Sequence, residues 1–132
     1  MSDFNKADLA AFILRVSTGI YFLVHGLTKL FVFTPAGTAG YFQSLGLPGA
    51  LGYLTMVLEI AGGLALIAGI ATRYVALVMA AVLLGAAWFG HAANGFSFSN
   101  PGGGWEYPVL WAVTMVALSL LGDGAPSLGK RR

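Results

Sequence analysis

A histidine and a lysine lie four residues apart in the apolar stretch YFLVHGLTKL, at positions His25 and Lys29. A charged side chain at the centre of a membrane helix costs about 2.5–3.5 kcal/mol on insertion scales, so such residues usually have a partner or a function. A histidine can take up or release a proton near physiological pH, and a lysine ammonium can donate hydrogen bonds to an oxygen. The pair therefore indicates a proton-handling or ligand-binding site inside a membrane.

Further ionisable residues lie within or at the ends of apolar stretches and are candidates for the same site. They are Arg15, Glu59, His91 and Glu106. At a rise of about 1.5 Å per residue, Glu59 falls near the middle of its stretch, and His91 and Glu106 fall nearer one boundary. We expect Glu59 to pair with Arg15 or with His25. Lys29 can pair with Glu106, and an exchange of partners among these residues also stays open.

Each of these residues also has a structural interpretation. Lys29 can extend its ammonium to lipid head groups, and Trp105 with Glu106 can belong to an interfacial aromatic belt. His91 can hydrogen-bond the connector that follows it. A carboxylate in the middle of a membrane, as at Glu59, is the hardest to explain by structure alone.

The composition points to lipid as the surrounding medium. Of the 132 residues, 58% are hydrophobic and 9% are charged, against about 25% charged in soluble domains. The net charge of +2, with scattered basic residues, excludes a nucleic-acid-binding patch. The absence of cysteine excludes disulfides, thiol redox chemistry and thiolate metal sites. The length corresponds to one domain, residues 1–132.

Four apolar stretches of about the length needed to cross a bilayer predict transmembrane helices. They are residues 9–33, 47–70, 72–93 and 105–121. The backbone must satisfy its own hydrogen bonds in lipid, so these stretches are predicted to be helical. The segments between them, 34–46 and 94–104, are rich in turn-forming residues and are interpreted as connectors. The fold class expected is an all-α membrane protein, with four helices in an up-down-up-down bundle.

The distribution of lysine and arginine predicts the orientation. Basic residues lie near the N-terminus, at Arg73 between the second and third stretches, and in the tail 130–132, whereas the connectors 34–46 and 94–104 have none. The positive-inside rule therefore predicts cytoplasmic N- and C-termini for a multi-pass protein of the inner (plasma) membrane. The first stretch is longer than the apolar region of a cleavable signal peptide, about 7–15 residues, so we expect it to be retained.

Several motifs resemble those of one family. They are RVSTGIYFLVHGLTKL at 15–30, FQSLGLP at 42–48, LEIAGGLALIAGIATR at 58–73, and GGGWEYPVLW around Trp105. In this order they resemble the DoxX family of small bacterial and archaeal membrane proteins. One departure is Gly129, where many members have an aspartate after Ser-Leu. The resemblance implies a four-helix membrane protein linked to membrane redox complexes, such as a thiosulfate:quinone oxidoreductase.

The function predicted is that of a membrane subunit of a redox system that binds quinone or quinol in the outer half of the bilayer. His25 and Glu59 are the predicted catalytic residues. The predicted cofactor-binding residues are His25, Lys29, Glu59, His91, Trp105 and Glu106. Tyr21, Phe22, Trp88 and Trp105 are the expected aromatic walls. Quinone is the cofactor expected, and neither haem nor a metal is expected.

The sequence contains no evident redox centre, so a bound cofactor or a partner subunit would have to carry electrons. The expected partners are the lipid bilayer and either other membrane or redox subunits or a second copy of this chain. Two alternatives remain open. One is a non-enzymatic assembly or scaffold subunit, and the other is a small transporter or proton channel, because intramembrane ionisable residues also mark such pathways.

Overall fold

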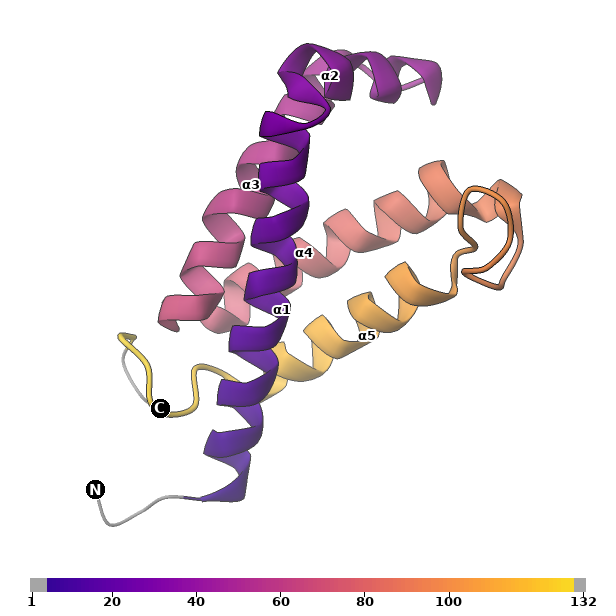
Figure 1. Cartoon of the computed structure of the whole chain (residues 1–132). Coiled ribbons are helices and arrows are strands. Elements are labelled where there is room, and N and C mark those ends of the chain that lie inside the picture. The colour runs from indigo at the N-terminus through magenta and orange to yellow at the C-terminus, as the bar shows by residue number, and fades with distance from the viewer. Residues whose placement is uncertain (1–4, 130–132) are drawn as a thin grey trace.

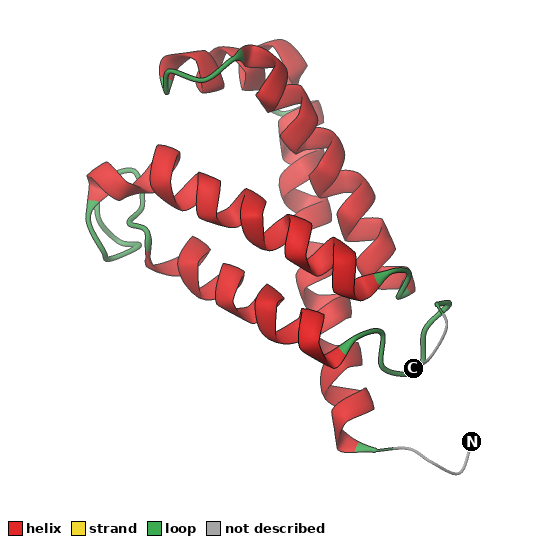
Figure 2. Ribbon diagram, turned by 180° about the vertical axis from the view of Figure 1, so that it is seen from behind, coloured by secondary structure: helices red, strands yellow, loops and turns green. Residues whose placement is uncertain are grey.

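A computed structural model describes residues 5–129, and these residues form helices and loops without a strand. The α-helices are α1 (Lys6–Phe31), α2 (Thr34–Ser44), α3 (Gly49–Ala68), α4 (Thr72–Ala86) and α5 (Glu106–Leu121). A π-helical turn (Ala87–His91) and a 3₁₀ turn (Ala92–Asn94) extend α4. Figures 1 and 2 show these elements from opposite sides. The prediction of an all-helical protein is confirmed.

Within residues 5–129, three helices are long and apolar enough to cross a membrane. They are α1, α3 and the continuous helix Thr72–Asn94. The fourth, α5, is apolar but has 16 residues, which corresponds to about 24 Å against a hydrocarbon core of about 30 Å. Four membrane crossings, and the side on which the termini lie, stay predictions.

The helices pack as two pairs that splay apart. Figure 1 shows α1 alongside α3 and α4 alongside α5, and the pairs diverge toward the end that carries α2. They meet around a buried apolar cluster that includes Phe22, Leu66, Met79 and Met115. Large apolar side chains also cover the outside, where Leu120 is 75% exposed. Such a surface suits contact with lipid.

Glycines bring the backbones of α1 and α3 into contact. A Cβ atom placed on Gly63 would lie 2.7 Å from the carbonyl oxygen of Gly19 and 2.9 Å from the backbone nitrogen of Leu23. Small residues permit such close approach between membrane helices. The close packing of this pair therefore depends on the absence of a side chain at Gly63.

Replacing Gly63 by alanine is expected to destabilise the protein by about 1–3 kcal/mol, because the added methyl group meets backbone atoms that cannot rotate away. The measurement is the free energy of unfolding in detergent. Gly85→Ala in α4 is the matched control, because a Cβ there meets nothing within 4 Å. Equal stability of the two variants would contradict the close packing of α1 and α3.

The segment 34–46 is not the simple connector that was predicted, because it contains α2. Pro35 lies in the first turn of this helix, where its missing N–H is tolerated. Thr38 and Ala39 are buried, and a Cβ on Gly52 of α3 would lie 3.1 Å from the Thr38 carbonyl oxygen. Thr38 also donates a 3.3 Å hydrogen bond to the carbonyl of Lys29. These tertiary contacts hold a glycine-rich segment in a helical conformation.

Other helix boundaries differ from the prediction by a few residues. α1 ends at Phe31 and not at residue 33, and α3 begins at Gly49 and not at 47. α3 ends at Ala68 because Gly69 adopts a left-handed conformation, with φ 79°, which commonly terminates helices. The third predicted helix leaves the α conformation at Ala87.

Candidate functional site

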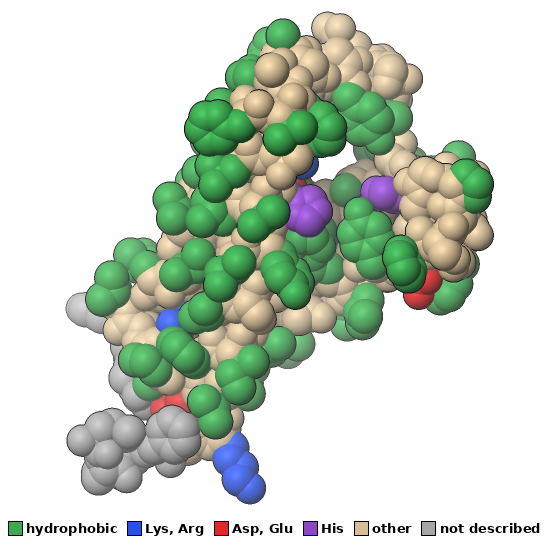
Figure 3. Space-filling view, in the orientation of Figure 1, with side chains coloured by type: hydrophobic (Ala, Val, Ile, Leu, Met, Phe, Trp, Pro, Cys, Tyr) green, Lys and Arg blue, Asp and Glu red, His purple; other side chains and the backbone are tan. Residues whose placement is uncertain are grey.

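A cavity of about 580 Å³ lies between the two helix pairs, and we call it the inter-pair cavity. Its wall is mainly apolar, with side chains such as Leu58, Val82 and Phe89. The polar residues that line it are His25, Lys29, Tyr41, Thr55, Glu59, His91 and Tyr107. Figure 3 shows a hollow with histidine side chains on both sides. Ligand sites commonly have about 300–1,000 Å³ and an apolar wall with few polar groups.

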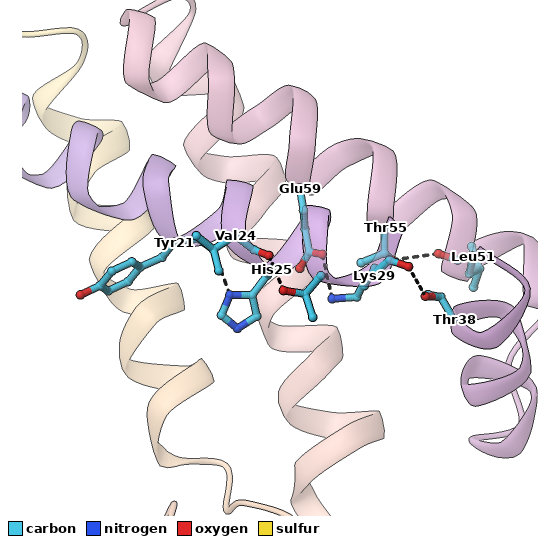
Figure 4. Close-up of polar contacts among 9 residues, drawn as sticks. Tyr21, Val24, His25, Lys29, Thr38, Leu51, Thr55 and Glu59 are labelled. Atoms are coloured by element: carbon cyan, nitrogen blue, oxygen red, sulfur yellow. Dashed lines mark hydrogen bonds and ion pairs between the residues drawn. The ribbon is translucent and has the colours of Figure 1, made fainter. Parts of the chain in front are cut away.

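An ion pair joins α1 and α3 at the wall of this cavity. The Nζ atom of Lys29 lies 2.8 Å from Oε1 of Glu59, whose side chain is 8% exposed. Figure 4 shows the two side chains pointing toward each other. Gly26 permits this approach, because a Cβ there would lie 3.0 Å from the backbone nitrogen of Ile60. Pairing lowers the cost of placing both charges away from water.

The predicted pairing of Lys29 with Glu106 is wrong. Oε2 of Glu106 instead accepts a 2.7 Å hydrogen bond from the backbone nitrogen of Phe98. Trp105 lies beside it with its ring edge on Phe96, at a centroid distance of 4.9 Å. The connector folds back over the first turn of α5, where Phe98 hydrogen-bonds Glu106 and the ring of Phe96 contacts that of Trp105. Neither of these two predicted cofactor-binding residues lines the inter-pair cavity.

The predicted pairing of Glu59 with Arg15 is also wrong. Arg15 is 1% exposed and donates a 2.7 Å hydrogen bond to the carbonyl of Leu66. It also donates to the carbonyls of Pro126, at 2.7 Å, and Asp123. Glu59 lies seven residues before Leu66, which is about 10 Å along a helix. Arg15 therefore binds the segment after α5 and stays away from the cavity.

His25 is held by α1 itself and by α5. Its Nδ1 atom lies 2.9 Å from the carbonyl oxygen of Tyr21, and its ring meets that of Trp111 edge-on at 5.3 Å. Trp111 in turn stacks on buried Phe22 at 4.4 Å. Within residues 5–129, no hydrogen bond joins His25 to Glu59, so their predicted pairing is wrong. The two residues are still brought to the same cavity.

His91 lies on the opposite wall, at the end of the π-helical turn. Its Nδ1 atom is 2.9 Å from the carbonyl oxygen of Gly103, and Asn94 donates to the same oxygen at 2.8 Å. The ring meets Tyr107 edge-on at 5.4 Å. π-Helical turns inside α-helices are frequent at functional sites, where they redirect a side chain.

The aromatic wall differs from the predicted one. Trp88 is 72% exposed and does not line the cavity, and Phe22 stacks on Trp111. The rings that line the cavity are those of Tyr41, Phe42, Phe89, Tyr107 and Trp111. Tyr107 and Trp111 were missed as site residues, although their four-residue spacing places them on one face of α5.

The cavity combines proton-accepting and hydrogen-bonding groups with an apolar slot. Among residues 5–129, no group of three or more histidine or acidic side chains is placed to hold a metal ion. The available groups are instead those that bind the polar head of an apolar organic molecule.

Comparisons with known proteins agree with the membrane assignment. The sequence model of the family described as DoxX matches residues 10–92. The chain is 41% identical over 83 residues to "Putative oxidoreductase CatD" of Bacillus subtilis (strain 168), which covers 62% of this chain and 60% of that protein. It is 34% identical over 85 residues to "Inner membrane protein YqjF" of Escherichia coli (strain K12), covering 64% of each. The match thus spans less than two thirds of these relatives. No solved structure matches.

Proposed function

The chain belongs to the DoxX family, and we propose that this multi-pass membrane protein is a subunit of a redox system that binds a quinone or quinol in the inter-pair cavity. One observation carries the proposal. His25, Lys29, Glu59 and His91 come from three helices and meet at one largely apolar cavity of about 580 Å³. A quinone ring needs an apolar slot together with polar partners for its two oxygens.

The residues of the cavity have complementary roles in this proposal. The ammonium of Lys29 has three N–H donors, and its ion pair with Glu59 leaves donors for a ring oxygen of the ligand. His25 accepts or releases the proton that accompanies a change of redox state. Trp111 supplies a flat wall beside His25. Electrons pass to or from a partner subunit, because the chain offers no redox centre.

The relatives support the setting of this function. The name of the Bacillus subtilis relative describes an oxidoreductase, and that of the Escherichia coli relative an inner membrane protein. We place this chain in the inner membrane with both termini in the cytoplasm. Under that orientation the inter-pair cavity lies in the outer half of the bilayer, because the pairs diverge at the end far from the termini (Figure 1).

The test is to extract lipids from the protein purified in mild detergent and to quantify quinones by mass spectrometry. We expect a near-stoichiometric quinone in the wild type and at least a roughly tenfold loss in His25→Ala, which is the change expected when about 1.4 kcal/mol of binding energy is removed. Val24→Ala is the matched control, because this neighbouring side chain is 54% exposed and does not line the cavity.

The outcomes separate the proposed function from its main alternative. A quinone that is retained in Val24→Ala and lost in His25→Ala supports the redox subunit. A wild-type protein that carries no quinone, and that binds none when quinone is added to it, overturns the proposal. That result would favour an assembly subunit in which the polar residues only tie helices together.

A further inference from the structure

The two histidines that line the inter-pair cavity have the same tautomer when their rings are neutral. Nδ1 of His25 lies 2.9 Å from the carbonyl of Tyr21, and Nδ1 of His91 lies 2.9 Å from the carbonyl of Gly103. A carbonyl oxygen can only accept a hydrogen bond, so Nδ1 carries the proton in each neutral ring. The other nitrogen, Nε2, is therefore a hydrogen-bond acceptor in both.

These two acceptors are available to a ligand. Among the described residues, neither His25 Nε2 nor His91 Nε2 has a hydrogen-bond partner, and both side chains line the cavity. Figure 4 shows the second ring nitrogen of His25 directed away from α1. His25 belongs to the α1–α3 pair and His91 to the α4–α5 pair, so the acceptors lie on facing walls.

A further acceptor, on α3, lines the same cavity. The hydroxyl of Thr55 donates its proton to the carbonyl of Leu51 at 2.8 Å, so its oxygen can only accept from a ligand. The donors on residues that line the cavity are Lys29, Tyr41, Tyr107 and the indole N–H of Trp111, which has no hydrogen-bond partner among the described residues. These donors do not distinguish redox states, because a phenolic oxygen accepts a hydrogen bond as a carbonyl oxygen does.

Resting on the function proposed above, we propose that the inter-pair cavity selects the reduced quinol, an aromatic diol, over the oxidised quinone. The two hydroxyl groups of a quinol can donate to His25 and His91 from opposite sides of its ring. A quinone has only acceptor oxygens, which would face the lone pairs of both rings and leave them unpaired. His25 is exposed and His91 is half-buried, so the cost arises once a bound ligand shuts these nitrogens off from water. An acceptor left unpaired in that state costs more than a hydrogen bond gains.

The test compares the dissociation constants of decyl-ubiquinol and decyl-ubiquinone, measured anaerobically by titration calorimetry on the full chain in detergent. We expect the wild type to bind the quinol roughly tenfold more tightly than the quinone. His25→Phe and His91→Phe, tested separately, should weaken quinol binding more than they weaken quinone binding, so that the preference for quinol falls. His25→Gln should restore part of the preference, because its amide oxygen is again an acceptor. Trp88→Phe, outside the cavity, is the control.

The possible results distinguish failure of the quinol preference from failure of the quinone site itself. Equal affinity of the wild type for both forms, or an equal loss of both in His25→Phe, overturns the selection of quinol and leaves the quinone site standing. Failure of the wild type to bind either form overturns the proposed function and this inference with it. Loss of the preference in a variant that melts at the wild-type temperature supports the inference.

Discussion

Replacing Glu59 by methionine is expected to lower the free energy of unfolding by about 3–5 kcal/mol, the usual cost of leaving a buried charge without its partner. Lys29 would then keep an ammonium at the cavity wall with its 2.8 Å partner removed. Lys29→Met should cost a similar amount, because the side chain of Glu59 is only 8% exposed. The measurement is reversible unfolding in mixed detergent micelles.

The double variant Lys29→Met/Glu59→Met gives the decisive comparison. It should be clearly more stable than the sum of the single effects predicts, because replacing a whole buried pair by apolar side chains is often nearly neutral. It should still fail to bind the quinol, since the ring oxygen loses its donor. If the two single losses simply add in the double variant, the ion pair contributes no coupling and the assignment is refuted.

The long helices could be predicted because hydropathy and length determine them almost alone. The stretch predicted as residues 105–121 is found as α5, Glu106–Leu121, which differs by one residue. α2 could not be predicted in this way. Its sequence contains Pro35, Gly37 and Gly40, which disfavour a helix on propensity. It forms because Thr38 packs against Gly52 across a contact between distant parts of the chain.

The sequence predicted several of the residues that line the cavity, but it did not predict which of them pair with each other. Depth along a helix follows from residue number, and it grouped His25, Lys29 and His91, which line the cavity, with Glu106, which does not. The rotation of one helix against another does not follow from residue number. Gly26 sets that rotation by admitting α3 close beside α1, and it brings Glu59 within reach of Lys29.

The partners of Arg15 lay beyond prediction for a different reason. Two of its acceptors are backbone carbonyls in the irregular segment after α5. Every residue has a backbone carbonyl, so the residue types do not indicate which carbonyls Arg15 binds. The same bonds bring the two ends of the described chain to one end of the molecule (Figure 1). The backbone nitrogen of Leu128 adds a 2.9 Å bond to the carbonyl of Ala68. Arg15 is thus the central connection between α1, α3 and this segment.

Replacing Arg15 by methionine is therefore expected to destabilise the protein by at least about 3 kcal/mol, because hydrogen bonds to a charged donor contribute about 1.5–3 kcal/mol each. The carbonyls of Leu66 and Pro126 would lose their donor at 2.7 Å, and the segment 122–129 should detach. Faster limited proteolysis of that segment, together with a lower melting temperature, would be the measured result.

Two matched variants show whether the guanidinium itself is responsible. Arg15→Lys should recover only part of the stability, because one ammonium cannot reproduce the planar set of donors that spans three carbonyls. Arg73→Met removes an arginine that makes a single long bond, 3.4 Å to the carbonyl of Ser119, so its loss should stay below about 1 kcal/mol. Were Arg15→Met no more sensitive to protease than Arg73→Met, Arg15 would not hold the segment in place. Since Arg15 lies far from the inter-pair cavity, Arg15→Lys should also keep the wild-type preference for quinol, which separates loss of stability from loss of ligand binding.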